Sequence, residues 1–181
     1  MSIAALVDLV EGLVAGDQTE ADQRADVLAW LRDTDDVYRR AKPDTPPRHL
    51  VSYVVPVDRR DGSILLIDHI NAGLWLPPGG HVEVKEDPAE TARREALEEL
   101  GLDVTVGKPI FITVTTTVGI DKGHTDVSLW YPVLADRHQP LVTDAGEFTE
   151  ARWWSLDDVD RADPGLFDPH LGRFLRKLRQ R

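Results

Sequence analysis

The most constraining feature of this sequence is a short helical segment with clear signals at both ends. Asp87 is a favourable N-cap and Pro88 suits the first helical position, while Gly101 is typical of the residue just past the C-terminus. These signals predict a helix over about Pro88 to Leu100. Its apolar residues recur at helical spacing and define an inward-facing side, made of Ala89, Ala92, Ala96, Leu97 and Leu100.

Another side of this helix concentrates negative charge. Glu95, Glu98 and Glu99 are three and four residues apart, so they crowd together where like charges repel. Arg94, four residues before Glu98, offers relief within the helix. A solvated acidic face is one explanation. A hard divalent cation is the other, because Mg²⁺ takes oxygen ligands and often joins carboxylates to substrate phosphates.

The glutamates belong to a longer pattern with fixed spacing, made of Gly80, Glu86, Arg94, Glu95, Glu98, Glu99 and Gly101. At ordinary residue usage of about 5–7% per position, chance agreement is on the order of 10⁻⁸ per window. The segment Gly80–Leu102 resembles a complete Nudix box, with Ala96 and Leu102 in its apolar positions. The resemblance implies a Nudix-type α/β/α sandwich with a mixed β-sheet. It also implies hydrolysis of a diphosphate bridge with Mg²⁺, for which Mn²⁺ can substitute.

The resemblance also implies roles for individual residues of the box. Glu98 and Glu99 are expected to be metal ligands, and Glu95 either a third ligand or the general base. Arg94 is expected to orient Glu95 or Glu98. Glu86 is expected to be a partner in that network, although an exposed acid near a helix start is an equally good description of it.

The resemblance implies two further metal ligands outside the helix. The backbone carbonyl of Gly80 is one, because glycines and prolines before the box bring the backbone close to the metal. A carboxylate from a later loop is the other, and Glu147 is the first choice, ahead of Glu150 and Asp144. An exposed loop acid is the alternative for Glu147.

Four residues are candidates for substrate contacts. His81 follows the first glycine of the box and can reach a phosphate, unless it is simply an exposed loop residue. His124 and Asp126 stand at the start of an expected strand and can face the same cleft. Trp75 can stack on a base, and packing in the core is the alternative.

Composition narrows the class of protein. The chain has 181 residues and a net charge of −11, which argues against a surface for duplex nucleic acid. It contains no cysteine, so a disulfide framework and a thiol nucleophile are excluded. No apolar run reaches the length of a membrane span. The apolar N-terminus lacks a basic region and is interrupted by Asp8 and Glu11, so we expect a cytoplasmic protein.

Three segments are expected along the chain. Residues 1–42 form an N-terminal helical extension, in which two amphipathic helices meet near Gly16 and the second reaches about Arg40. Residues 43–49 form a proline-rich connector, and residues 50–181 form the Nudix hydrolase domain with a C-terminal helix. The apolar side of the helical hairpin is expected to pack on the same chain, to form a homodimer contact or to act as an active-site lid.

Strands dominate the middle of the chain. The Asp61-Gly62 pair predicts a hairpin turn, Ser155 with Asp158 predicts a capped helix, and Asp168-Pro169 predicts the start of the C-terminal helix. β-branched and aromatic runs predict strands at Leu50–Val57, Ile64–Asp68, Val104–Val106, Ile110–Val118, Val127–Ala135 and Ala151–Trp154.

The sequence contains no P-loop, nucleophile elbow or HExxH zinc motif, so clustered carboxylates are its main chemical resource. Such a cluster suits phosphoryl chemistry, in which positioning and charge neutralisation dominate. The expected function is hydrolysis of a nucleoside diphosphate derivative, such as a nucleoside triphosphate, a nucleotide sugar or a dinucleotide. The alternative is a Nudix-like domain that senses a nucleotide or another ligand without catalysis.

Overall fold

A single twisted sheet organises the molecule in the computed structural model, which describes residues 1–41, 45–117, 123–142, 146 and 148–181. Within these ranges the sheet has seven strands. Five of them lie side by side in the order β3-β2-β1-β6-β5, while β4 pairs with β1 and β7 pairs with β2. The strands are β1 Arg48–Asp58, β2 Ile64–His69, β3 Leu74–Leu76, β4 Gly79–His81, β5 Phe111–Thr116, β6 Thr125–Ala135 and β7 Phe148–Trp154.

The central strand β1 makes the sheet mixed. It runs parallel to β6 and antiparallel to β2 and β4. Both faces of β1 are covered, so successive residues enter different cores: Val54 joins one buried cluster and Val55 joins the other. A strand buried on both faces is expected to be as rich in valine as this one.

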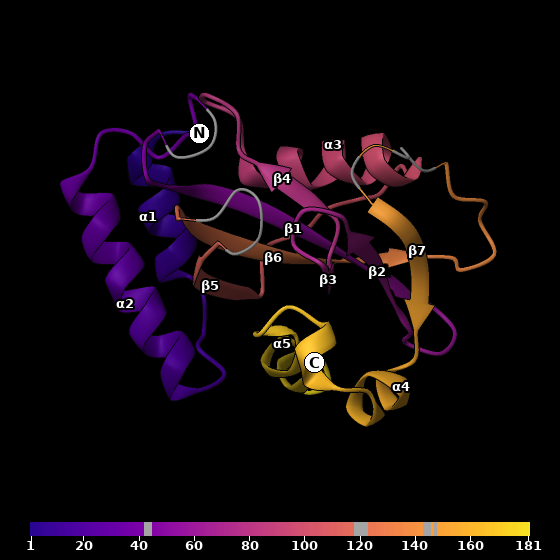
Figure 1. Ribbon diagram of the computed structural model, residues 1–181. Helices are drawn as coiled ribbons and strands as arrows, with labels where there is room; N and C mark the ends of the chain where they lie inside the picture. Colours follow the sequence, from indigo (N-terminus) through magenta and orange to yellow (C-terminus); the bar gives the residue numbers. More distant parts are fainter. Residues whose placement is uncertain (42–44, 118–122, 143–145, 147) are drawn as a thin grey trace.

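Helices cover both faces of the sheet and complete three layers (Figure 1). Helices α1, α2 and α3 pack into the cluster on one face, and α4, α5 and Phe167, which follows η1, pack into the cluster on the other. Their bounds are α1 Ile3–Glu11, α2 Gln18–Asp33, α3 Pro88–Leu100, α4 Leu156–Arg161, η1 Pro164–Leu166 and α5 Leu171–Leu178. The predicted α/β/α sandwich with a mixed sheet and an N-terminal helical hairpin is therefore confirmed. None of the helices within the described ranges is long and apolar enough to span a membrane.

The N-terminal hairpin packs within its own chain. Ser2 caps α1 and Asp17 caps α2. The apolar sides of these helices lie in the same buried cluster as the strands and α3. Polar contacts reinforce the docking: buried Glu20 of α2 lies 2.5 Å from Lys177 of α5, and Asp17 pairs with Arg173 at 2.7 Å.

The second helix is shorter than predicted, because it ends at Asp33 and not near Arg40. Side chains just beyond that point bind nearby backbone groups and offer an alternative to helical hydrogen bonds. The Thr34 hydroxyl donates to the carbonyl of Asp36, and the Asp36 carboxylate accepts from the Tyr38 amide. The periodicity of the sequence continues past Asp33, but these local bonds stop the helix.

Two other predicted elements differ in the structure. Val104–Val106 is not a strand: Val104 is buried and Val106 packs against the core, so apolar burial explains the two valines without strand pairing. The C-terminal helix begins at Leu171, because the Asp168 carboxylate accepts a hydrogen bond from the His170 amide and holds a turn before the helix. The other predicted strands are present with shifted ends, and Val118 lies outside the described residues.

Candidate active site

The acidic helix and the glycine turn before it touch one another directly. Strand β4 pairs with β1 so that Gly80 lies opposite Ser52. A Cβ atom added at Gly80 would lie 2.6 Å from Cδ of Glu95, so no larger residue fits while that carboxylate keeps its place. The Ser52 hydroxyl donates to the carbonyl of Pro88 at 2.7 Å, which ties the start of α3 to the same part of β1. The structure therefore brings the backbone of Gly80 and the Glu95 carboxylate together.

Arg94 connects three of the predicted site carboxylates. Its Nη1 donates to Glu95 Oε1 at 2.7 Å and to Glu98 Oε2 at 3.0 Å. Its Nε donates to Glu86 Oε1 at 3.1 Å. Burial alone would lower the pKa of Arg94, but the hydrogen bonds and charges of Glu86, Glu95 and Glu98 outweigh it and raise the pKa. This guanidinium neutralises much of the repulsion that the sequence predicted.

Glu86 has three kinds of donor. Besides Arg94, its carboxylate accepts from the Thr91 hydroxyl at 2.6 Å and from the Glu83 amide at 3.1 Å. Burial would raise the pKa of Glu86, but the Arg94 and Thr91 hydrogen bonds lower it below its ordinary value. Glu86 is thus a fixed anion that holds Arg94, and it does not line the cavity described below.

The remaining glutamates of the box differ in exposure. The Glu98 side chain is 60% exposed, whereas Glu99 is only 5% exposed. Among the described residues, Glu95, Glu98 and Glu99 do not converge as one compact group of metal-ligand atoms. Their donor atoms are all carboxylate oxygens, however, and Glu95 and Glu98 reach the same nitrogen of Arg94. This oxygen donor set suits a hard divalent cation such as Mg²⁺.

A cavity of about 900 Å³ lies beside the box. Gly80, Arg94 and Glu95 line it, which places the turn and one end of the acidic network on its wall. Its volume is within the range of sites for small organic ligands. The predicted loop ligand Glu147 lies outside the described residues.

Three of the four predicted substrate contacts line this cavity, namely His81, His124 and Asp126. The fourth, Trp75, does not. Its ring packs edge-on against Trp154 with centroids 5.2 Å apart, so its position matches the core-packing alternative. Neighbouring residues of a strand point to opposite faces, and accordingly Leu74 and Leu76 line the cavity while Trp75 does not.

His81, His124 and Asp126 are joined by a residue that the sequence did not single out. The imidazole of His49 on β1 lies with Nε2 3.2 Å from Asp126 Oδ1, and its ring centroid is 4.7 Å from that of His81. Burial alone would raise the pKa of Asp126, but the neighbouring imidazoles of His49, His81 and His124 outweigh it and keep the pKa well below its ordinary value. We call these four residues the imidazole cluster. His49 lies near the start of a largely apolar strand, and the only signal for it in the sequence is that a histidine occurs there.

Other cavity residues were also missed. Arg39, from the segment after α2, brings a positive charge to the cavity, and Tyr53 contributes an aromatic ring from β1. Asp168 lines the cavity from the segment before α5, and burial raises its pKa to about 6. None of these residues belongs to a sequence motif. Each lies at the cavity because of where the fold places its strand or loop, so the sequence alone does not reveal it.

A family model described as the NUDIX domain matches residues 47–178. The chain belongs to the NUDIX family. The predicted membership, based on Gly80–Leu102, is therefore confirmed. The matched region includes the whole sheet, the box and α5, but neither α1 nor α2.

Relatives in the NUDIX family agree with this assignment. A MutT-like protein of Streptomyces ambofaciens is 40% identical over 76 residues, covering 42% of this chain and 49% of the relative. A CTP pyrophosphohydrolase of Escherichia coli K12 is 40% identical over 63 residues, covering 33% of this chain and 47% of the relative. The chain thus spans about half the length of these two curated relatives.

A solved structure shows the same fold. A hydrolase of the NUDIX family from Clostridium perfringens aligns with a TM-score of 0.58 at 27% identity. The alignment covers 74% of this chain and 97% of the other. The shared region is the sheet-based NUDIX fold, which positions the glycine turn and α3 in this chain.

Proposed function

We propose that this protein is a Nudix hydrolase that cleaves the diphosphate linkage of a nucleoside diphosphate derivative with the help of Mg²⁺. The observation that carries the proposal is the contact between Gly80 and the Glu95 carboxylate on the wall of the cavity. In this contact the first glycine of the box meets a glutamate of α3, and both residues line a cavity large enough for a small ligand. The E. coli CTP pyrophosphohydrolase among the relatives supports a nucleotide as the substrate class.

Each box residue has a physical task in this proposal. Glu95, Glu98, Glu99 and the carbonyl of Gly80 would hold the divalent cation, which when bound would polarise a phosphoryl group and lower the pKa of the attacking water. Glu95 is either a ligand or the general base that accepts the proton of that water. Arg94 orients Glu95 and Glu98, and Glu86 keeps Arg94 in place through its own hydrogen bonds.

The cavity also suggests how a nucleotide would lie. Arg39 and the divalent cation that the glutamates would hold would face the phosphates, because a polyphosphate chain needs positive charge around it; Arg39 and Glu95 both line the cavity. Tyr53 and Phe167 offer apolar and aromatic surface for the base, and Asp168 can bond its polar edge. We propose a nucleoside triphosphate first, with nucleotide sugars and dinucleotides as further members of the test panel.

The assignment of segments completes the proposal. Residues 50–181 would be the catalytic domain, residues 43–49 its connector and residues 1–42 a helical extension. The family model begins at residue 47, which supports this division. Because Arg39 lines the cavity, the extension would contribute one side chain to substrate binding.

The test is phosphate-product release from a panel of nucleoside triphosphates, nucleotide sugars and dinucleotides with and without Mg²⁺. Wild type should turn over at least one member only when Mg²⁺ is present. Glu99→Gln should lower kcat by at least about 10²-fold, because even partners behind a metal ligand are worth 10–100-fold. The matched control is Glu90→Gln on the same helix, whose exposed carboxylate pairs only with Arg93 among the described contacts. It should retain activity.

One outcome would favour the ligand-sensing alternative. Tight nucleotide binding by the wild type without turnover of any panel member would contradict the hydrolase proposal. Equal activity of Glu99→Gln and Glu90→Gln would contradict the assigned roles of the box residues.

A further inference from the structure

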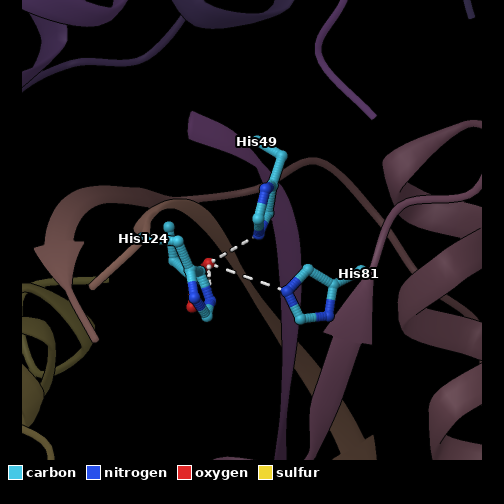
Figure 2. A group of neighbouring side chains, drawn as sticks. His49, His81 and His124 are labelled. Atoms are coloured by element: carbon cyan, nitrogen blue, oxygen red, sulfur yellow. Dashed lines mark ion pairs between the residues drawn. The ribbon is translucent and has the colours of Figure 1, made fainter. Parts of the chain in front are cut away.

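Three imidazole rings converge on one carboxylate oxygen beside the cavity (Figure 2). The Nε2 atoms of His49, His124 and His81 lie 3.2, 3.4 and 3.7 Å from Asp126 Oδ1. One nitrogen or oxygen atom from each of the four residues lies within 4.8 Å of all the others. The arrangement is a compact shell of three nitrogen donors and one oxygen donor.

The sheet register builds this imidazole cluster. His49 on β1 and Asp126 on β6 are direct partners in the parallel pair. His81 ends β4, opposite Val51 of β1, and His124 immediately precedes β6. Adjacent strands lie about 4.8 Å apart, so residues at these positions bring their side chains together. The cluster is therefore a property of the fold and not of a local motif.

Hydrogen bonds outside the cluster orient two of the rings. Nδ1 of His49 lies 2.8 Å from the carbonyl of Pro46, to which it must donate. Nδ1 of His124 lies 3.2 Å from the Thr117 hydroxyl, and that hydroxyl can donate in turn to the carbonyl of His124. The Pro46 carbonyl fixes the Nδ1 proton of His49, and the Thr117 hydroxyl permits the same tautomer in His124; in that tautomer both Nε2 lone pairs point inward. An outer hydrogen bond of this kind is the usual support of a metal-binding histidine.

The inward-facing atoms lack the partners that buried polar atoms normally have. His49 is fully buried and His124 is 2% exposed. Within the described part of the chain, Nε2 of His49, Nε2 of His81 and Oδ1 of Asp126 are buried and make no hydrogen bond. Lone pairs of neutral imidazoles and a carboxylate repel one another, and buried polar atoms without partners are costly. Positive charge among these atoms removes both penalties: a proton on an imidazole does so for one contact, and a metal cation bound by all four groups would do so for every donor at once.

We propose that His49, His81, His124 and Asp126 bind one transition-metal dication, best matched by Zn²⁺, at a site separate from the glutamates of the box. Zinc binds imidazole nitrogen and carboxylate oxygen at about 2.0–2.2 Å in a tetrahedron, whose edges are then about 3.3 Å. The three nitrogen-to-oxygen distances of 3.2, 3.4 and 3.7 Å lie close to that value. The four donor atoms lie within 4.8 Å of one another, so the imidazole nitrogens would move closer together to complete the shell.

The donor atoms separate this site from the acidic helix. Imidazole suits zinc and related transition metals, whereas Mg²⁺ prefers oxygen ligands alone. Four protein ligands also close the coordination shell, which is typical of a structural zinc site. Its task would be to clamp β4 to β1 and β6. His81 directly follows Gly80, so the metal would fix the position of the turn against which Glu95 packs.

Metal content tests the proposal directly. The full-length protein is stripped with a chelator, incubated with Zn²⁺, passed through a desalting column and analysed for zinc per chain. Wild type should retain about one zinc per chain. Asp126→Asn and His124→Asn should each bind zinc at least about 10²-fold more weakly, because loss of an outer partner alone costs 10–100-fold. His138→Asn, which changes an exposed histidine in a loop, is the matched control and should retain zinc.

Stability supplies a second readout. Zinc at 100 times its Kd should raise the Tm of the wild type by about 5–10 °C, and chelation should reverse the shift. The shift should vanish in Asp126→Asn. Co²⁺ in place of Zn²⁺ should give the visible absorption spectrum of a tetrahedral site. This spectrum needs only the wild-type protein, so it tests the proposal even if a cluster variant fails to fold.

The proposed hydrolase function and the zinc site can fail separately. Glu99→Gln should lose Mg²⁺-dependent turnover and still bind one zinc per chain. Absence of zinc from the wild type, together with no Tm shift and no tetrahedral Co²⁺ spectrum, would overturn the zinc site whatever the activity. Unchanged zinc affinity in both Asp126→Asn and His124→Asn would also overturn it.

Discussion

Two charged assemblies flank the same cavity, and they are built in opposite ways. The first, which we call the acidic edge, consists of Glu86, Arg94, Glu95, Glu98 and Glu99. Its residues come from one turn and one helix, its donors are oxygens, and Arg94 already occupies part of its centre. The imidazole cluster comes from three parts of the sheet, and its inward-facing donors include Nε2 of His49 and of His81, which make no hydrogen bond among the described residues.

On the two proposals made above, one cavity offers two kinds of cation site. The acidic edge is stable without a bound metal, because the guanidinium of Arg94 balances part of its negative charge. Among the described residues no guanidinium is bonded between the members of the imidazole cluster, and its buried donor atoms face one another. We therefore expect a weakly held, exchangeable Mg²⁺ at the acidic edge and a tightly held zinc at the imidazole cluster.

The largest expected effect concerns Asp168, a cavity acid that belongs to neither assembly. Burial raises its pKa to about 6 from an ordinary 3.8, so the folded state holds this proton more tightly than the unfolded state. Stability should therefore fall as pH rises through this interval, by about 3 kcal/mol once ionisation is complete. The free energy of unfolding of Asp168→Asn minus that of wild type should increase by this amount between pH 4 and pH 8 in urea titrations. A constant difference would show that Asp168 ionises at its ordinary pKa.

The next effect tests the contact that joins the two assemblies. Gly80→Ala would push a methyl group into the Glu95 carboxylate, with its Cβ 2.6 Å from Cδ. Displacement of a catalytic group by about 1 Å can cost about 10²-fold in rate, so kcat should fall by about that factor. Gly107→Ala is the control, because nothing lies within 4 Å of a Cβ at that position. Equal kcat values for the two variants would show that Glu95 does not need its place beside Gly80.

The smallest effect tests how far Arg94 substitutes for a metal. Arg94→Ala would leave Glu86, Glu95 and Glu98 facing one another without their shared donor, and we expect a loss of about 2 kcal/mol in the free energy of unfolding. Millimolar Mg²⁺ should restore part of that stability in this variant. Arg93→Ala, on the exposed side of the same helix, should lose less than about 1 kcal/mol and show no such rescue. Equal losses for the two variants would mean that the acidic edge is merely a solvated face.

The same contrast explains how much of the site the sequence could predict. The helix from Pro88 to Leu100 and its acidic side follow from capping residues and spacing, which are local in the chain. The contact of Glu86 with Arg94 agrees with the network that the Nudix resemblance implied. His49 was missed because its proximity to Asp126 arises from the register of two strands that are far apart in the sequence.

Two other features could not be predicted from the sequence: the end of α2, where side-chain hydrogen bonds compete with the helix, and the face of the sheet on which Trp75 lies. The end of α2 depends on hydrogen bonds of Thr34 and Asp36 that no helical periodicity reveals. Trp75 could face either side of the sheet until the pairing of β3 with β2 fixed its direction. The overall layers were predictable, because amphipathic helices and a strand rich in valine admit few arrangements.

The central claim is that two chemically distinct cation sites share this cavity. X-ray diffraction from crystals grown with both Zn²⁺ and Mn²⁺, measured on either side of the zinc absorption edge, tests it most directly. We predict a zinc peak about 2.0–2.2 Å from Nε2 of His49, His81 and His124 and from Asp126, and a separate manganese site on the carboxylates of the acidic edge. A zinc peak only at Glu95, Glu98 and Glu99, with nothing bound among the imidazoles, would contradict the account.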